Sequence, residues 1–400
     1  MLTLEQAQAA IIEGIIPASA TEIIDLGQCP GRFLAQTTTA QVANPAFDGS
    51  AMDGYAVNIS DLQQHGFRLP LQGESYCGLT EKPVLQPAST MRIFTGAPLP
   101  EGANAVVIQE LIRCEGSDIL FPEDVRPGQN IRTMGEDFNI GDVLYVSGHR
   151  LRSSDVALLA AAGVSQLEVY RQPRALVVAT GDELVAPGQP LQFGQIYESN
   201  RQVTILMLQQ LGVVVDDGGT IADEAGALEA MFDGAADYDF IISSGGVSVG
   251  DHDLVKQVFA ERGEIQFWKA SIKPGKPIAF GRIGERTHFF ALPGNPVSSL
   301  VTFKLFVEPG LYAWSHSQRE YPLLQLKSSN DFKSKPGRRQ FLRARMFQED
   351  GGLQVEMLSG QGSHMLRSLS QANCLIQVDE DSSGFSAGDA VKVLPLFVDI

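Results

Sequence analysis

The stretch SSGGVSVGDHD, residues 243–253, combines residue types that bind anions. Its glycines let the backbone approach a ligand closely, its serines supply hydroxyl groups, and a helix expected to begin near Asp253 points its positive end at the same place. The acidic residues that end the stretch add oxygen ligands suited to Mg²⁺. The alternative is a glycine-rich turn in which Asp253 only caps the helix. The residues expected to grip a phosphate or another oxyanion are Ser244, Gly245, Gly246, Ser248 and Gly250.

Two more unusual loops follow predicted strands of the same region. Gly181, Asp182 and Glu183 come directly after ALVVAT, and the turn 293–296, which begins and ends with Pro293 and Pro296, comes after HFFAL. Ligands of open α/β sheets bind outside the carboxyl ends of the strands. We therefore expect carboxylates, backbone amides and rigid turns to share one rim of a sheet.

Positive charge is concentrated after the predicted strand IQFWKA. Lys269, Lys273 and Lys276 lie within eight residues of each other in a chain that is otherwise rich in acidic residues. Such a cluster would offset the overall charge where a phosphate ester or another oxyanion docks. A solvated surface turn is the alternative, although Pro274 and Pro277 fix the backbone beside the charges and favour a functional role.

One motif supports a different chemistry. Residues 246–250, GVSVG, satisfy the GxSxG pattern of a nucleophile elbow, with a strand before it, a helix after it and histidines downstream. The doubled glycine lengthens the approach from the strand, and the acidic DHD would place negative charge beside a developing oxyanion. A serine hydrolase that uses Ser248 therefore remains the less favoured alternative.

Two polar, glycine-rich stretches lie outside this region. FDGSAMDGYAV contains Asp53 between apolar residues, and FTGAPLPEGANAVV contains Thr95 in a loop that its prolines make rigid. Either stretch could be only a β-turn. Together they extend the candidate chemistry to the N-terminal half of the chain.

The elements that would position the central loops alternate between strand and helix from Arg174 to about Trp314. Alternation at this spacing predicts a three-layer α/β domain with a largely parallel sheet that helices cover on both sides. The first helix is expected to begin at Asn200, which can cap it, and the second at Asp223. The apolar residues that recur at helical spacing in the first helix are Val203, Leu206, Met207 and Leu211.

Short strands dominate both ends of the chain. An N-terminal helix leads into Thr-rich extended sequence, then glycine and proline punctuate short strand-like runs, and SDVALLAAAGV returns to helix. After Tyr321 five runs alternate apolar and polar residues between glycine-rich turns: LLQLKS, QFLRARMF, LQVEML, NCLIQVDE and AVKVLPL. These five strands predict a small barrel or sandwich.

Composition limits the possible classes of protein. The chain has 400 residues, which at roughly 150 per domain predicts several domains. Its net charge of −17 disfavours nucleic acid and anionic lipid as partners. Four irregularly spaced cysteines suggest reduced thiols, and neither a signal peptide nor a membrane-spanning run is apparent. We expect a cytoplasmic protein.

Eight of these strings occur in an order that resembles one family. They are SAMDGYAV, TGAPLPEGANAVV, NIRTMGED, ATGDEL, IYESN, SSGGVSVGDHD, IKPGKP and LPGNPVS. The chain resembles the molybdopterin molybdenumtransferases, which are molybdenum insertases similar to the C-terminal domain of gephyrin. The resemblance covers nearly the whole chain, and eight strings in order are far more specific than any one alone.

The resemblance implies four domains. They are a helical linking domain (1–40 and 140–172), a β-rich insertion domain (41–139), a three-layer α/β molybdopterin-binding-like domain (173–318) and a C-terminal small β-barrel (319–400). It also implies a homodimer in which the α/β domain of one subunit faces the β-rich insertion of the other. Transient contact with a molybdopterin adenylyltransferase and with apo-molybdoenzymes is a further expectation.

The implied reaction inserts molybdate into adenylylated molybdopterin and releases AMP with the help of Mg²⁺. By motif match, the resemblance assigns catalytic roles to Asp53, Thr95, Glu183, Asp223, Asp253, Lys269 and Lys273. Glu183 and Asp253 are the expected Mg²⁺ ligands. Residues expected to line the substrate site are Lys276, Pro293, Pro296 and Ser363, together with the glycine-rich loop.

The chain departs from the family pattern at two positions. Gly49 stands where Asn is common, and Glu198 stands where Asp is common, so the hydrogen bond of the first side chain and the reach of the second need explanation. A non-catalytic scaffold that binds a pterin or a peptide remains an alternative function, because a fold does not fix a function.

Overall fold

The computed structural model describes residues 1–222, 224–246, 254–349 and 351–396. The chain divides into two compact units. Unit 1 contains residues 1–22, 31–33 and 169–400, and unit 2 contains residues 23–30 and 34–168. Strands β1 (Thr21–Asp25) and β12 (Gln166–Tyr170) pair with each other, and the boundary between the units crosses both.

A mixed sheet forms the centre of unit 1. Its strand order is β16-β13-β17-β21-β20-β18, and the first four strands are parallel. β20 runs antiparallel to both neighbours, so β18 points in the same direction as β21. The strand bounds are β13 (Arg174–Thr180), β16 (Val214–Ile221), β17 (Phe240–Ser244), β18 (Gly263–Lys269), β20 (Pro277–Ile283) and β21 (Thr287–Leu292).

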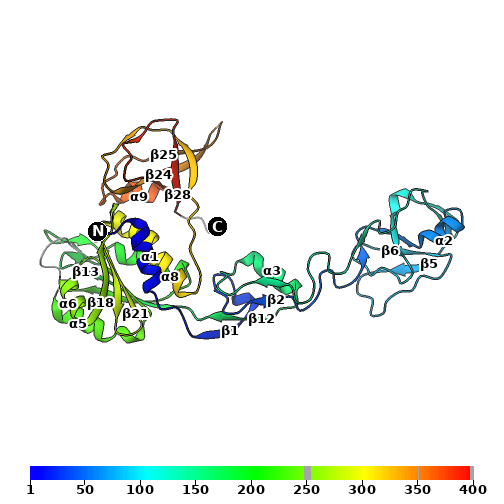
Figure 1. Ribbon diagram of the computed structural model, residues 1–400, viewed down its shortest axis with the longest axis horizontal. Helices are drawn as coiled ribbons and strands as arrows, with labels where there is room; N and C mark the ends of the chain where they lie inside the picture. The colour runs from blue at the N-terminus through cyan, green and yellow to red at the C-terminus, as the bar shows by residue number, and fades with distance from the viewer. Residues whose placement is uncertain (223, 247–253, 350, 397–400) are drawn as a thin grey trace. The chain divides into compact units, whose positions relative to one another are not determined.

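Separate apolar clusters cover the two faces of this sheet. Helices α5 (Ala225–Asp233) and α6 (Leu254–Arg262) lie on one face, where Phe232 and Phe259 pack against Phe289. On the other face lie α1, α4, α8 and the helices between β21 and α8; Figure 1 labels α1 and α8 there. Their bounds are α1 (Leu4–Gly14), α4 (Asn200–Gln210), α7 (Pro296–Thr302), the π-helix η4 (Phe303–Val307) and α8 (Glu308–Trp314). The predicted three-layer α/β domain is confirmed.

Local signals explain where these helices begin. Thr3 and Gln6 form a capping box at the start of α1, whose buried residues Leu4, Ala7 and Ile11 face the core. The structure corrects the prediction for α4. Asn200 is its first residue and makes no cap, because its side-chain amide donates to Gly294 O at 2.7 Å instead. Leu206, expected in the apolar face, is 58% exposed, whereas Leu208 is fully buried.

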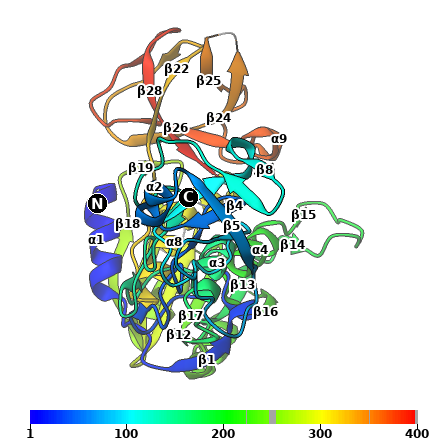
Figure 2. The same ribbon diagram turned by 90° about the vertical axis from the view of Figure 1, so that its right-hand side faces the viewer.

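The C-terminal region of unit 1 is a closed barrel. The strands are paired in the order β24-β25-β22-β28-β26, and β26 pairs back to β24, which closes the ring (Figure 2). This settles the choice between barrel and sandwich. The bounds are β22 (Leu324–Ser328), β24 (Arg339–Glu349), β25 (Gly352–Met357), α9 (Leu366–Gln371), β26 (Cys374–Val378) and β28 (Ala390–Pro395), with the small pair β23 (Phe332–Lys333) and β27 (Gly384–Phe385) beside them.

Unit 2 is rich in short strands. Its main sheet has the order β7-β4-β6-β5-β9-β8 around a core that includes Val57, Leu62, Leu69 and Val107. Asn58 caps α2 by accepting hydrogen bonds from the backbone N–H groups of Ser60 and Asp61. The bounds are β4 (Gly54–Val57), α2 (Ile59–Gln64), β5 (Arg68–Ser75), β6 (Thr90–Ile93), β7 (Ala105–Ile108), β8 (Arg113–Glu115) and β9 (Asp118–Leu120).

The rest of unit 2 consists of short pairs and one helix. β2 (Thr38–Thr39) pairs with β11 (Val143–Tyr145), β3 (Gly49–Ser50) pairs with β10 (Ile131–Arg132), and α3 spans Ser153–Ala161. The predicted fold class, a multidomain α/β plus β chain with a helical linking part and a terminal barrel, is confirmed. The exact domain boundaries stay a prediction, and α1 belongs to the compact unit that holds the α/β sheet. In the described ranges, no helix has the length and apolar character needed to cross a membrane.

Candidate active site

Three predicted loops leave one edge of the unit 1 sheet. Ala179 of β13 pairs with Ser244 of β17, and Ser244 pairs with Leu292 of β21, so the carboxyl ends of these strands are adjacent. Glu183 is exposed just beyond β13, Gly245 follows β17, and the buried Pro293 follows β21. The arrangement brings the carboxylate, the glycine backbone and the rigid turn to one rim, as the order of strands along the chain suggested.

Gly245 holds two of these loops together. Its N–H donates to Leu292 O at 3.1 Å, and it adopts a φ of +94°. A Cβ at this position would lie 2.5 Å from Thr180 O, so only glycine fits between the ends of β13 and β21. The neighbouring Ser244 is almost completely buried. The hydroxyls of Thr180 and Ser243 are also buried and have no hydrogen-bond partner within the described residues.

The lysine cluster belongs to the same edge of the sheet. Lys269 ends β18, which is parallel in direction to β21, and Lys273 is exposed in the short strand β19 (Ile272–Lys273). Lys276 is half-buried, and its carbonyl accepts the Ala270 N–H at 3.1 Å. β19 pairs in parallel with β24 at Arg339 and Gln340, which anchors the lysine segment on the barrel.

The barrel also contacts the turn after β21. Val297 N–H, next to the half-buried Pro296, donates to Ser363 O at 3.1 Å. Ser363 lies in a loop that the fully buried Arg343 of β24 supports by donating to Gly360 O at 2.6 Å and to Gly362 O at 3.0 Å. Sequence analysis did not single out Arg343, because nothing in the run QFLRARMF distinguishes a buried arginine from an exposed one.

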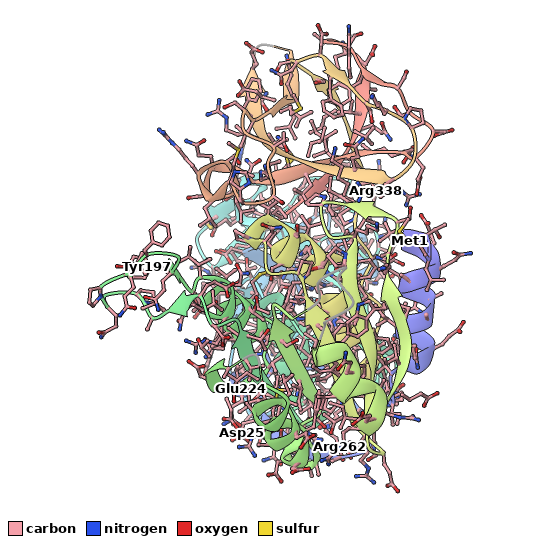
Figure 3. The ribbon with its side chains drawn as sticks, turned by 90° about the vertical axis from the view of Figure 1, so that its left-hand side faces the viewer. Met1, Asp25, Tyr197, Glu224, Arg262 and Arg338 are labelled. Atoms are coloured by element: carbon pink, nitrogen blue, oxygen red, sulfur yellow. The ribbon has the colours of Figure 1, made fainter. Side chains whose placement is uncertain are left out.

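The loop that leaves β13 forms a small arm. β14 (Leu184–Val185) pairs with β15 (Ile196–Tyr197), and Ile196 N–H donates to Glu183 O at 2.9 Å. Figures 2 and 3 show this arm standing away from the sheet, and Figure 3 labels Tyr197, the last residue of β15, on it. The base of the arm therefore fixes the backbone of Glu183.

Glu198, one of the two departures from the family pattern, has a structural role. Its buried carboxylate accepts the Arg201 N–H at 2.7 Å and so binds the first turn of α4. The Arg201 guanidinium lies 3.6 Å from Glu198 Oε2 and also pairs with Asp217 of β16. A Cβ on Gly49, the other departure, would lie 3.2 Å from Ala97 O, which leaves little room for a side chain.

In unit 2, Asp53 and Thr95 form a tight pair. The backbone N–H and the hydroxyl of Thr95 both donate to Asp53 Oδ1, each at 2.8 Å. These two hydrogen bonds, the backbone one first, lower the pKa of Asp53 below its usual value, so the exposed carboxyl group is held in its ionised form. The two stretches that sequence analysis selected separately therefore meet at one point.

Several predicted residues lie outside the described part of the chain. They are Asp223, Ser248, Gly250 and Asp253. Within the described ranges no group of three or more His, Cys, Asp or Glu side chains is placed to hold a metal ion. Of the two predicted Mg²⁺ ligands, Glu183 lies in the described part of the chain and Asp253 lies outside it.

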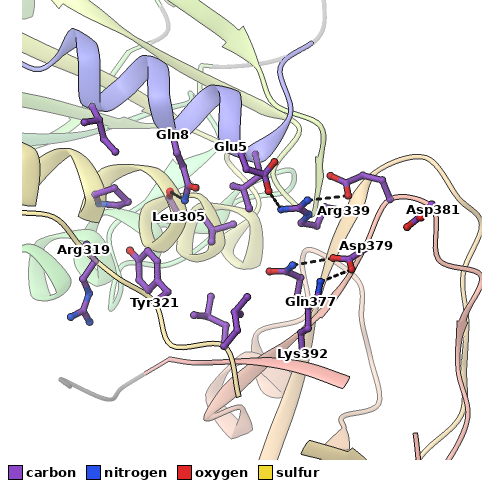
Figure 4. Close-up of a pocket in the computed structure, with 16 residues that line it drawn as sticks. Glu5, Gln8, Leu305, Arg319, Tyr321, Arg339, Gln377, Asp379, Asp381 and Lys392 are labelled. Carbon is purple, nitrogen blue, oxygen red and sulfur yellow. Dashed lines mark hydrogen bonds and ion pairs between the residues drawn. The ribbon is translucent and has the colours of Figure 1, made fainter. Parts of the chain in front are cut away.

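A large cavity lies elsewhere in unit 1. It measures about 740 Å³ and lies where α1, η4 and the barrel meet (Figure 4). Glu5, Arg339, Asp379 and Lys392 make ion pairs along its wall, and none of the predicted site residues lines it. This cavity is therefore separate from the rim where the predicted site residues lie.

Known proteins resemble this chain over its full length. Residues 2–163 match the family model described as "MoeA N-terminal region (domain I and II)", residues 176–313 match "Probable molybdopterin binding domain", and residues 325–396 match "MoeA C-terminal region (domain IV)". The molybdopterin molybdenumtransferase of Haemophilus influenzae is 40% identical over 99% of this chain and 98% of its own. The enzyme of that name from Nostoc is 34% identical over 94% and 89%.

A solved structure shows the same arrangement. The molybdopterin biosynthesis moeA protein of Pyrococcus horikoshii superposes with a TM-score of 0.85 at 28% identity, covering 99% of this chain and 100% of the other. The fold is that of a multidomain enzyme with a molybdopterin-binding-like α/β domain. The chain belongs to the molybdopterin molybdenumtransferase family, as its motifs predicted. The reported matches support neither the serine hydrolase nor the scaffold alternative.

Proposed function

We propose that this protein completes the molybdenum cofactor by transferring molybdenum from molybdate to adenylylated molybdopterin, with release of AMP. The observation that carries the proposal is the shared edge of the unit 1 sheet, where the ends of β13, β17, β21 and β18 bring Glu183, Gly245 and Lys269 to one rim. Both substrates are anionic. A rim with lysines and a glycine-rich loop is suited to them despite the negative charge of the whole chain.

In this proposal the basic residues bind the anionic groups of the substrates, and the acidic residues orient water and bind Mg²⁺. Lys269 and Lys273 neutralise phosphate or molybdate oxygens. The glycine-rich loop beyond Gly245, whose own N–H donates to Leu292 O, offers backbone N–H groups to the same anion. Glu183 orients the water that cleaves the phosphoanhydride, which yields AMP and leaves the phosphate ester on molybdopterin. When bound, Mg²⁺ would supply charge neutralisation at the bridging phosphates, with Glu183 and Asp253 as its proposed ligands.

The assembly we propose is a homodimer in the cytoplasm. Asp53 and Thr95 of one subunit complete the site on the α/β rim of the other. This gives the exposed Asp53, whose carboxylate Thr95 holds by hydrogen bonds, a role in the reaction. The enzyme would receive its substrate from a molybdopterin adenylyltransferase and pass its product to apo-molybdoenzymes.

The proposal is tested by AMP release from adenylylated molybdopterin, with and without molybdate, in the presence and absence of a Mg²⁺ chelator. We expect AMP release that requires molybdate and falls on chelation. Lys273→Met should lower the rate about tenfold or more, since it removes a charge-assisted contact. Lys335→Met is the matched control, because Lys335 is an exposed lysine outside the rim. AMP release that is independent of molybdate, or equal in both variants, would refute the proposal.

A further inference from the structure

Unit 2 contains a cavity of about 620 Å³ beside the Asp53–Thr95 pair. Pro98 lines it and belongs to the same loop as Thr95. Cys77, next to the lining residue Gly78, donates its S–H to Thr95 O at 3.4 Å. None of the residues to which the motifs assign a catalytic or binding role lines this cavity, so the motifs give it no function.

The walls of the cavity are fixed by backbone hydrogen bonds. Leu99 N–H donates to Asp48 O at 2.8 Å, and Met134 N–H donates to Asp48 Oδ1 at 2.7 Å. Glu101, another lining residue, donates its N–H to Pro83 O at 2.8 Å. The cavity is therefore preformed, and its volume lies within the range of about 300–1,000 Å³ that is usual for small-molecule sites.

Charge decides which ligand the cavity can accept. Among its lining residues, the carboxylates Asp48, Glu81 and Glu101 outnumber the single lysine, Lys82. A wall of this sign repels phosphate and molybdate. The anionic parts of the substrate are thus disfavoured here, and its neutral part, which carries hydrogen-bond donors, is compatible with these carboxylates.

The remaining lining residues favour a flat ring. Phe47 is 47% exposed and Met134 is 58% exposed, although both are apolar and line the cavity. Aromatic and thioether side chains pack well against planar heterocycles. Asp48 is exposed where it lines the cavity, and its Oδ1 accepts the Met134 N–H, so the carboxylate is held in place and can accept further hydrogen bonds.

We propose that this cavity binds the pterin ring of the substrate, an assignment that rests on the proposed function. A 2-amino-4-oxopteridine carries an exocyclic amino group beside a ring N–H, and this pair of donors matches a carboxylate. Asp48 accepts hydrogen bonds from that edge, and Phe47 stacks on the ring.

The test measures binding of pterin itself, 2-amino-4-oxopteridine, to the full chain by quenching of its fluorescence, with AMP binding measured in parallel. We expect Asp48→Asn and Phe47→Ala each to weaken pterin binding about tenfold to a hundredfold and to leave AMP binding unchanged. Asp124→Asn, an exposed carboxylate of unit 2 outside the cavity, is the control and should bind pterin normally.

The outcomes separate this assignment from the proposed function. No saturable pterin binding by the wild-type protein, or equal binding by Asp48→Asn and Phe47→Ala, overturns the cavity assignment even where molybdate-dependent AMP release is intact. Loss of pterin binding in Lys273→Met alone would also overturn it, because the ring would then lie at the rim. Pterin binding that depends on Asp48, in a protein without AMP release, supports the cavity and refutes the proposed function.

Discussion

Replacing Arg343 tests whether a buried charge supports the loop that reaches the rim. Arg343 is completely buried, and burial lowers the pKa of its guanidinium. It donates to Gly360 O, Gly362 O and, at 2.9 Å, to Ser368 Oγ. In Arg343→Met the aliphatic stem remains but these donors are lost.

The cost follows from the partners that are left behind. Both carbonyls keep another donor, because Gly360 O still accepts from the Ser368 hydroxyl at 2.8 Å and Gly362 O still accepts from the Met365 N–H at 3.1 Å. The cost is therefore that of the three lost hydrogen bonds, at about 0.5–1.5 kcal/mol each. Relief from burying a charge offsets part of this sum, so we expect a net loss of about 1–3 kcal/mol in the free energy of unfolding.

Urea unfolding followed by circular dichroism measures this loss. Arg345→Met is the matched control, because Arg345 lies two residues along the same strand, is 56% exposed and pairs with Glu356 at 3.0 Å on the surface. It should cost less than about 1 kcal/mol. Equal midpoints for Arg343→Met and wild type would refute the reasoning. AMP release should also fall in Arg343→Met under native conditions, because the Ser363 carbonyl that holds the start of α7 loses its support.

Two pH dependences follow from buried groups. Burial alone would raise the pKa of Asp155, but hydrogen bonds from His149 and from the backbone and side chain of Arg152 bring that pKa to about 2. Its contribution of about 2 kcal/mol is therefore present above pH 4 and lost as the pH falls towards 2. Asp155→Asn should destabilise the protein at pH 7 and hardly at all at pH 2, and an equal cost at both values would contradict this. Burial lowers the pKa of His288 to about 4, so stability should fall by up to about 3 kcal/mol between pH 6.5 and pH 4. His288→Gln should flatten that slope in urea titrations, and an unchanged slope would show that His288 is not its cause.

Much of the rim could be predicted because strands that alternate with helices along the chain are usually parallel, and the carboxyl ends of parallel strands lie at the same edge of the sheet. Once ALVVAT, DFIISS and HFFAL are identified as neighbouring parallel strands, the residues after them must share an edge. The location of Glu183, Gly245 and Pro293 at this edge therefore follows from the sequence alone. A small barrel or sandwich could also be predicted, because five runs of alternating apolar and polar residues, separated by glycine-rich turns, have few ways to bury their apolar faces.

Strand β20 was missed for a local reason. PIAFGRI begins with proline and contains Gly281, and both residues are typical of turns. The structure uses the glycine for close strand pairing, since a Cβ on Gly281 would lie 2.2 Å from Glu264 O. Because β20 was not predicted, the antiparallel edge of the sheet was not predicted either, nor was the direction of β18, which places Lys269 at the rim.

Side-chain roles that depend on tertiary contacts could not be predicted from the sequence. Asn200 has the residue type of a helix cap, but a carbonyl of the turn after β21 competes for its amide. Leu206 fits the helical period, yet α4 buries the face that contains Leu208. The pairing of Asp53 with Thr95 required the register of β4 and β6, which no local pattern fixes.

The central claim is that Asp53 and the rim of unit 1 act together across two subunits. It is tested most directly by mixing Asp53→Asn with Glu183→Gln, each inactive alone, under conditions that allow subunits to exchange. Half of the dimers in an equal mixture are hybrids, and each hybrid has one intact site, so about a quarter of wild-type AMP release should return. Hybrid dimers that form but remain inactive would contradict the account.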